Sequence, residues 1–106
     1  MGKYMFHATY TGEGLVGLLK EGGSRRRAAL TDTIEAMGGN VEGLYYAFGE
    51  TDLYIICDLP DDATATAVSL NIAKAGALNM RATVLLTPEM VDEAVKKTVP
   101  YRPPGA

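Results

Sequence analysis

The chain has 106 residues, of which 47% are hydrophobic and 22% are charged, and its formal net charge is −3. This length fits one domain, and the hydrophobic share is enough for a buried core, which argues against a disordered chain. The weakly negative charge argues against a nucleic-acid partner, because phosphate binding needs a net basic surface. A single cysteine excludes an internal disulfide framework. Since the sequence contains no signal segment and no apolar run of about 18 residues, we expect a cytoplasmic protein without a membrane partner.

The N-terminal part predicts a strand and then a helix. Residues 3–10 (KYMFHATY) are rich in aromatic side chains and contain no breaker, which is typical of a strand. Residues 11–20 are ambiguous, because leucines at helical spacing compete with three glycines that weaken a helix. Ser24 is a good N-cap for a helix that carries one apolar stripe and ends at Gly38 and Gly39.

The middle of the chain predicts a β-hairpin. Residues 41–48 (VEGLYYAF) and 53–59 (LYIICDL) have strand composition, and the turn-forming residues 49–52 lie between them. A four-residue turn sets the register, so that side chains two apart on either strand share one face of the sheet. The opposed pairs are then Phe48 with Leu53 and Tyr46 with Ile55.

The C-terminal part predicts a helix, a strand and a second helix. Pro60 and the acidic residues after it open the first helix, and Gly76 closes it. Residues 80–86 (MRATVLL) form the fourth strand, and residues 87–89 (TPE) start a short helix with proline in its first turn. The proline-rich tail 99–106 is expected to be extended and to lie on a neighbouring subunit.

This order of elements predicts an α+β fold, ferredoxin-like βαββαβ, with a four-stranded antiparallel sheet, helices on one face and a short C-terminal helix. The whole chain, residues 1–106, is then a single domain. Its core spans residues 3–87, and the C-terminal helix with the proline-rich tail spans residues 88–106.

The two faces of the predicted sheet differ in character. The first is strongly apolar and should lie under the helices; it carries Leu44, Tyr46, Phe48, Leu53, Ile55, Cys57 and Leu59. The second carries Val41, Gly43, Tyr45, Ala47, Tyr54, Ile56 and Asp58, with Met5, His7 and Thr9 from the first strand and Arg81, Thr83 and Leu85 from the fourth. This second face is too apolar and aromatic for a solvated sheet. We therefore expect the protein to be its own partner, as a homodimer or a larger ring joined sheet to sheet.

A series of short segments, mostly turn and cap residues, follows in a characteristic order along the chain: Tyr4, Tyr10-Thr11, Ser24-x-x-Arg27, Met37-Gly38-Gly39, Gly49-x-x-Asp52, Pro60-Asp61-Asp62 and Thr87-Pro88-Glu89-Met90. With these segments the chain resembles the GYD domain family from Tyr4 to about Val95. The family is named for a Gly, Tyr and Asp cluster, and this chain has Thr51 where the family has its tyrosine. The resemblance implies a ferredoxin-like fold similar to that of dimeric α/β-barrel proteins, and it implies no established biochemical role.

Candidate binding residues gather on the second face of the sheet. His7 is the only histidine, and Asp58 on the neighbouring strand is expected to orient its ring, either for proton transfer or for a structural hydrogen bond. Tyr45, Tyr54 and Arg81 share this face and would either line a cavity for an aromatic or carboxylated ligand or pack across a dimer.

A second candidate is the basic segment 25–27 (RRR), which lies against the favourable direction of a helix dipole. It suggests an anion-binding role for Arg27, with a ligand, a phosphate or another subunit's carboxylates as the anion; the alternative is a solvated turn with a local salt bridge. The aspartates of residues 52–62 match no metal loop, so no metal is expected. No cofactor motif is present, and Cys57 is expected to be an inert buried thiol.

Three functional classes remain open from the sequence. The first is a small homo-oligomer of uncharacterised role that binds a small molecule or a protein partner. The second is a cofactor-independent oxygenase or isomerase of the dimeric α/β-barrel type acting on a small aromatic or polyketide-like substrate. In that class, His7 would accept a proton, Asp58 would orient it, and Arg81 or Tyr54 would stabilise an enolate. The third is a structural or assembly module.

Overall fold

The computed structural model describes residues 1–106 and contains four strands and four helices. It confirms the α+β, ferredoxin-like arrangement. An additional helix lies between the first strand and the first helix that the sequence predicts. In chain order the elements are β1 (Gly2–Tyr10), α1 (Gly12–Glu21), α2 (Gly23–Ala36), β2 (Asn40–Tyr46), β3 (Leu53–Leu59), α3 (Asp62–Lys74), β4 (Leu78–Leu85) and α4 (Pro88–Val95).

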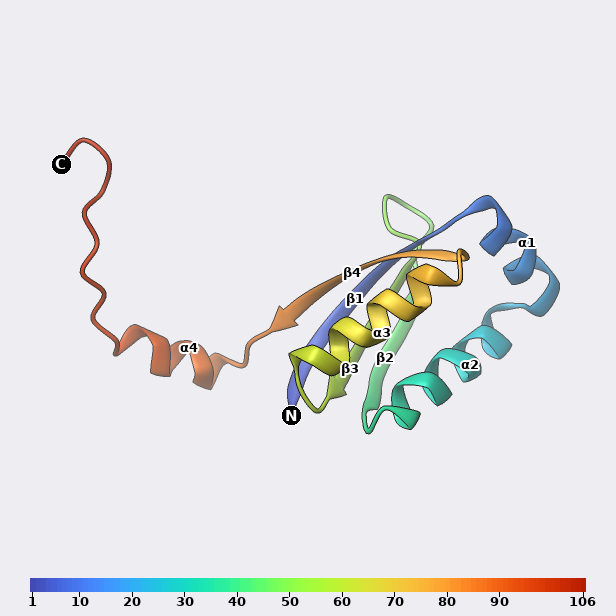
Figure 1. The fold of residues 1–106 in the computed structure, drawn as a ribbon, viewed down its shortest axis with the longest axis horizontal. Coiled ribbons are helices and arrows are strands. Elements are labelled where there is room, and N and C mark those ends of the chain that lie inside the picture. The colour runs from blue at the N-terminus through green and yellow to red at the C-terminus, as the bar shows by residue number, and fades with distance from the viewer.

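The four strands form one antiparallel sheet in the order β2-β3-β1-β4. Helices α2 and α3 cover one face of this sheet, and the other face carries no helix (Figure 1). We call the uncovered side the open sheet face. The central strands β1 and β3 alternate strictly between buried and half-buried residues, because successive side chains point to opposite faces.

The hydrophobic core lies between the sheet and the two covering helices. Its largest fully buried side chains include Phe6 on β1, Ile34 on α2 and Leu53 on β3. Cys57 is also buried there, as the sequence predicts. Burying large apolar side chains of this kind contributes roughly 1.5–3 kcal/mol each, so this layer holds the domain together.

The hairpin register differs from the predicted one by two residues. Tyr46, not Phe48, lies opposite Leu53, because Ala47 and Phe48 belong to the loop, where Phe48 has a φ of 52° and is 58% exposed. A shift of two residues preserves the faces, so Tyr46 still packs against the core. The placement of Val41 on the open face is wrong: an irregularity between Val41 and Gly43 places Val41 opposite Cys57, against the core.

The segment after β1, which the sequence left ambiguous, forms the separate helix α1 before α2. Thr11 caps α1 through a 3.0 Å hydrogen bond from the Gly14 amide, and Gly14 lies so close to the Ala77 carbonyl that a side chain would not fit. The predicted N-cap Ser24 is wrong, because α2 begins at Gly23 after Gly22, whose φ is 82°. Two helices fit here because glycine permits both the close approach and the sharp turn.

The C-terminal arm, which we define as residues 86–106, extends away from the rest of the molecule (Figure 1). Thr87 caps α4 by accepting from the Met90 amide, as the sequence predicts. No residue of α4 is buried. None of the helices is long and apolar enough to cross a membrane.

Candidate functional site

His7 lies in the centre of the open sheet face. Its strand neighbours are Tyr54 on β3 and Arg81 on β4, so the register brings together three of the predicted site residues. The His7 and Tyr54 rings meet edge to face with centroids 5.5 Å apart. The His7 Nε2 lies 3.2 Å from the Thr83 Oγ1, within hydrogen-bond distance, which holds the imidazole between two strands.

A small polar hollow of about 200 Å³ opens beside His7. Thr51 is 5% exposed and lies in its wall, although it comes from the hairpin loop and not from the sheet. The hollow combines an imidazole, a guanidinium, an amide and two hydroxyls, a set that suits a small anionic or carboxylated group. Its lining residues are His7, Ala8, Thr9, Thr51, Asn79 and Arg81.

The hairpin loop is fixed against β1 by Asp52. The Tyr10 amide donates to Asp52 Oδ2 at 2.9 Å, and the Asp52 amide donates to the Ala8 carbonyl at 3.0 Å. These contacts place Thr51 in the wall of the hollow. The sequence analysis missed Thr51 and Asn79 as lining residues. The Gly49-x-x-Asp52 turn contained a signal for Thr51. Asn79 is revealed only by the register of β1 with β4, which places it opposite Thr9.

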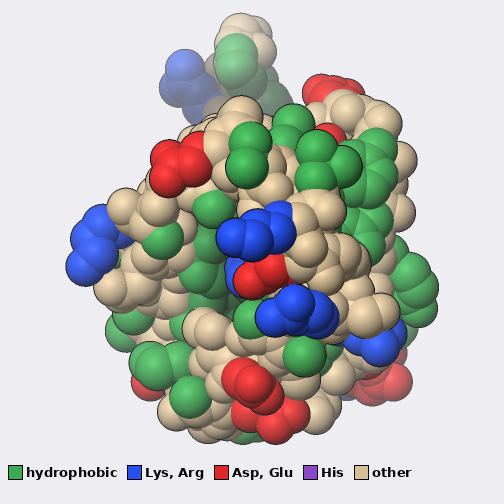
Figure 2. Space-filling model, turned by 90° about the vertical axis from the view of Figure 1, so that its right-hand side faces the viewer, with side chains coloured by type: hydrophobic (Ala, Val, Ile, Leu, Met, Phe, Trp, Pro, Cys, Tyr) green, Lys and Arg blue, Asp and Glu red, His purple; other side chains and the backbone are tan.

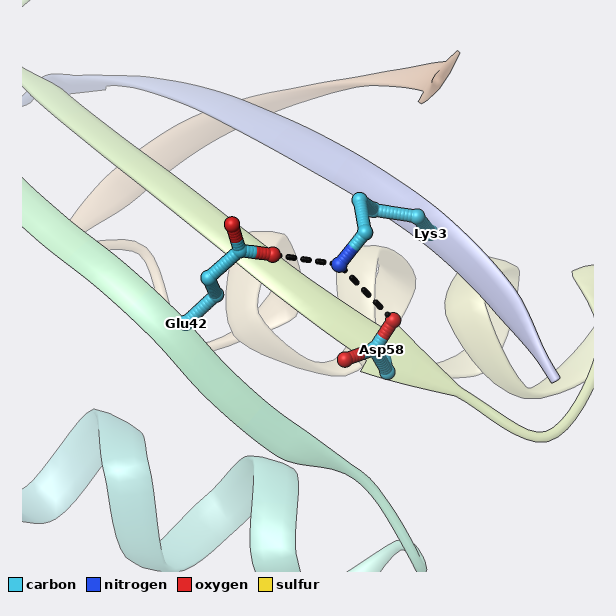
Figure 3. A network of polar contacts seen from close by, with 3 residues as sticks. All are labelled: Lys3, Glu42 and Asp58. Carbon is cyan, nitrogen blue, oxygen red and sulfur yellow. Dashed lines mark hydrogen bonds and ion pairs between the residues drawn. The ribbon is translucent and has the colours of Figure 1, made fainter. Parts of the chain in front are cut away.

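Asp58 does not lie beside His7. It lies opposite Lys3, about 13 Å along the strand from the position opposite His7 at roughly 3.3 Å per residue. Lys3 donates to Asp58 Oδ1 at 3.0 Å and also bonds Glu42 on β2 (Figure 3). These hydrogen bonds, first that of Glu42 and then that of Asp58, raise the pKa of Lys3. The expected Asp58–His7 contact is therefore absent, and an enzyme reading that needs Asp58 as orienter loses that support.

Tyr45 and Arg27 also lie away from the hollow. Tyr45 is opposite Tyr54 on the outer strand β2 and is 67% exposed. Arg27 shares with it a separate depression of about 360 Å³ between α2 and the edge of the sheet. Of the predicted site residues, His7 and Arg81 therefore line the hollow and Tyr54 lies beside it, whereas the others lie outside it.

The basic segment 25–27 lies at the end of the molecule formed by α1 and the start of α2. There, basic and acidic side chains alternate around a hollow (Figure 2). Arg26 forms a 3.3 Å ion pair with Glu21, which is the local salt bridge that the sequence left as an alternative. Arg25 and Arg27 are exposed and have no ion pair within the chain.

Two further titratable groups, Cys57 and Asp61, have structural roles. Burial raises the pKa of the Cys57 thiol to about 11, which keeps it protonated and unreactive at neutral pH. The Asp61 carboxylate caps α3 by accepting from the Thr64 hydroxyl and amide, and these bonds lower its pKa. No three His, Cys, Asp or Glu side chains gather into a group that could hold a metal ion.

The fold and the open sheet face place the chain among small α+β domains with an uncovered sheet. The family model described as GYD domain matches residues 4–95, and the chain belongs to the GYD domain family. No match was found among the curated proteins or among the solved structures.

Proposed function

We propose that this GYD domain protein is a homo-oligomer that binds a small carboxylated or otherwise anionic molecule between two open sheet faces. The single observation that carries the proposal is the polar hollow beside His7, surrounded on the same face by half-exposed apolar side chains. A second copy laid on this face would cover the apolar surface and close the hollow at the same time.

The apolar surroundings support the pairing of two sheets. Met5, Tyr54 and Ile56 are only half-buried on the open sheet face, and Met5 lies opposite Ile56 in the central strand pair. Apolar and aromatic side chains in the middle of a sheet are typical of an interface, with charged groups at the rim. The Lys3 ion-pair cluster at one end of the face would form such a rim.

The charges of the hollow support the ligand class. Arg81 is the only residue with a fixed charge in the lining, and a guanidinium binds a carboxylate in a bidentate manner. His7 beside it can donate a further hydrogen bond, and Tyr54 offers a ring edge or face to an aromatic ligand. The hollow alone is small, so a second copy would have to complete the binding cavity.

The test combines subunit mass with binding of benzoate as a probe. Ile56→Asp places a charge in the proposed interface, and Leu70→Asp places the same charge on an exposed position of α3 as the matched control. We expect sedimentation velocity to give the same larger assembly for the native protein and for Leu70→Asp, and a smaller assembly for Ile56→Asp.

Benzoate binding should follow subunit mass and the guanidinium. In titrations followed by NMR, the native protein should bind benzoate, and both Ile56→Asp and Arg81→Gln should weaken binding by at least ten-fold. Arg102→Gln in the exposed tail should leave it unchanged. A monomeric native protein, or benzoate shifts that Arg81→Gln leaves intact, would overturn the proposal.

A further inference from the structure

The C-terminal arm carries an apolar helix face without a partner. Met90, Val91 and Val95 on α4 are 49%, 47% and 77% exposed, and together with Ala94 they lie on one side of the helix. The opposite side is charged. An isolated helix of eight residues is marginal in water, so this amphipathic segment needs a surface on which to pack.

The helix layer of the domain contains an apolar groove of about 430 Å³ between α2 and α3. Its floor is made of the buried residues Leu30, Val68 and Leu78, and Met37 at its rim is 41% exposed. Nine of its twelve lining residues are hydrophobic. A groove between two helices is a common receptor for the apolar face of a third.

The arm of the same chain is poorly placed to fill this groove. Only Leu86 and Thr87 join β4 to α4, and two residues span at most about 7 Å. Leu85 lies at the far end of β4 from Leu78, which lines the groove, about 23 Å away at roughly 3.3 Å per residue. Moreover, in the view of Figure 1, α3 lies between α2 and β4, the strand from which the arm leaves. The occupant of the groove therefore has to come from elsewhere.

The charges along α4 and α2 are complementary when the two helices run parallel. In the arm, carboxylates within residues 89–93 precede Lys96 and Lys97; on α2, the arginines of residues 25–27 precede carboxylates within residues 32–35. At 1.5 Å per residue, the charge centres are separated by about 8 Å on the arm and about 11 Å on α2. With the apolar side of α4 in the groove, its acidic residues would lie along the rim near Arg25 and Arg26, and its lysines near the carboxylates towards the C-terminal end of α2.

We propose that α4 of one copy packs in the α2–α3 groove of a second copy, parallel to the partner's α2, and that two copies exchange arms reciprocally. The partner is thus a second copy of this chain. The exposed Arg25, next to the groove-lining Arg26, gains carboxylates of another subunit as its anions. This contact uses the helix layer, so it does not depend on the pairing of open sheet faces.

The test is cross-linking between two separately labelled copies. One full-length copy carries Ala94→Cys in the apolar side of α4, and the other carries Asn71→Cys at the groove. Because the native thiol Cys57 is buried, a short bis-maleimide joins only the introduced cysteines. We expect covalent heterodimers in at least five-fold excess over a mixture in which Leu70→Cys, on the exposed surface of α3, replaces Asn71→Cys.

Two further sets of variants make the result decisive. In the Ala94→Cys copy, charge reversal of Glu89, Asp92 and Glu93 to lysine should remove the cross-link, and reversal of the arginines of residues 25–27 to glutamate in the other copy should restore it. Equal yields for Asn71→Cys and Leu70→Cys would overturn the proposal. So would a higher yield with Thr83→Cys, which would place the arm on the open sheet face, or a link formed only within one chain carrying both cysteines. An Ile56→Asp background separates this contact from the sheet pairing.

Discussion

At the scale of single residues, the polar side chains divide between the architecture and the candidate site. Asp52 and Asp61 accept backbone hydrogen bonds, and Asp58 is held by Lys3. His7 and Arg81 are left facing the polar hollow. Polar side chains that bond the backbone therefore hold the loops and caps, and those that line the hollow are available to a ligand.

Two tyrosines of β1 make the stability of the fold sensitive to alkaline pH. A 2.5 Å hydrogen bond to Asp62 is the main cause that raises the pKa of Tyr4 from 10.0 to about 12. Burial is the main cause for Tyr10, whose pKa is also about 12. Because the folded state favours the neutral phenols, their contribution to stability is complete below pH 10 and is lost as the pH rises towards 12.

We therefore expect the native protein to lose free energy of unfolding between pH 10 and about 12, and the Tyr4→Phe/Tyr10→Phe variant to lose less over the same range. Urea denaturation at pH 8, 10 and 11 measures the difference. Tyr101→Phe in the exposed tail is the control and should follow the native protein. Cys57 also loses its proton in this range, so the contribution of the two tyrosines is measured by the difference between the native protein and the variant. Equal slopes for all three proteins would contradict the prediction.

At the scale of elements, the junction between α1 and α2 depends on one backbone conformation. Gly22 has φ 82° and ψ 166°, a region that is essentially reserved for glycine. Gly17 inside α1 has no such requirement, and a side chain at either position would meet nothing within 4 Å. Alanine at either position causes no steric clash, so a comparison of the two substitutions isolates the effect of backbone strain at Gly22.

We expect Gly22→Ala to lower the free energy of unfolding by about 1–3 kcal/mol and Gly17→Ala to raise it by about 0.5–1 kcal/mol. Chemical denaturation at neutral pH gives both values, and circular dichroism shows whether α1 is retained. If both substitutions shifted stability in the same direction, α1 and α2 would not be joined by the turn described here.

At the scale of the whole molecule, the arm and the domain are separate units. No residue of α4 is buried, and the molecule measures 57 Å along its longest axis but only 33 Å and 22 Å along the others. Folding of the domain should therefore not depend on residues beyond Thr87, whereas the exchange of arms between copies should.

A chain ending at Thr87 tests this separation. At concentrations low enough for a monomer, its free energy of unfolding should equal that of the full chain within about 0.5 kcal/mol, since surface changes of this kind have small effects. As the concentration rises, the full chain should gain stability over the shortened one, because association stabilises the folded state by mass action. A large loss already in the monomer would mean that the arm packs on its own domain.

The sequence by itself determined the order of the four strands and of α2, α3 and α4, the starts of α3 and α4, and which residues of β1 and β3 face the core, because these features depend on local periodicity and on turn chemistry. It could not place Val41, Ser24 or Phe48 correctly. Their positions depend on an irregularity in β2, on a second helix that closes against Ala77, and on a loop fixed to β1.

For the site, the sequence brought His7, Tyr54 and Arg81 to one face, because alternation along a strand is a local rule. Only the tertiary structure decided which of them are neighbours. Strand register placed Arg81 and Tyr54 on either side of His7 and placed Asp58 beside Lys3. The loop held by Asp52 brought Thr51 into the hollow. Contacts between distant segments depend on how whole strands align, and that alignment is set by the packed sheet and not by any one stretch of sequence.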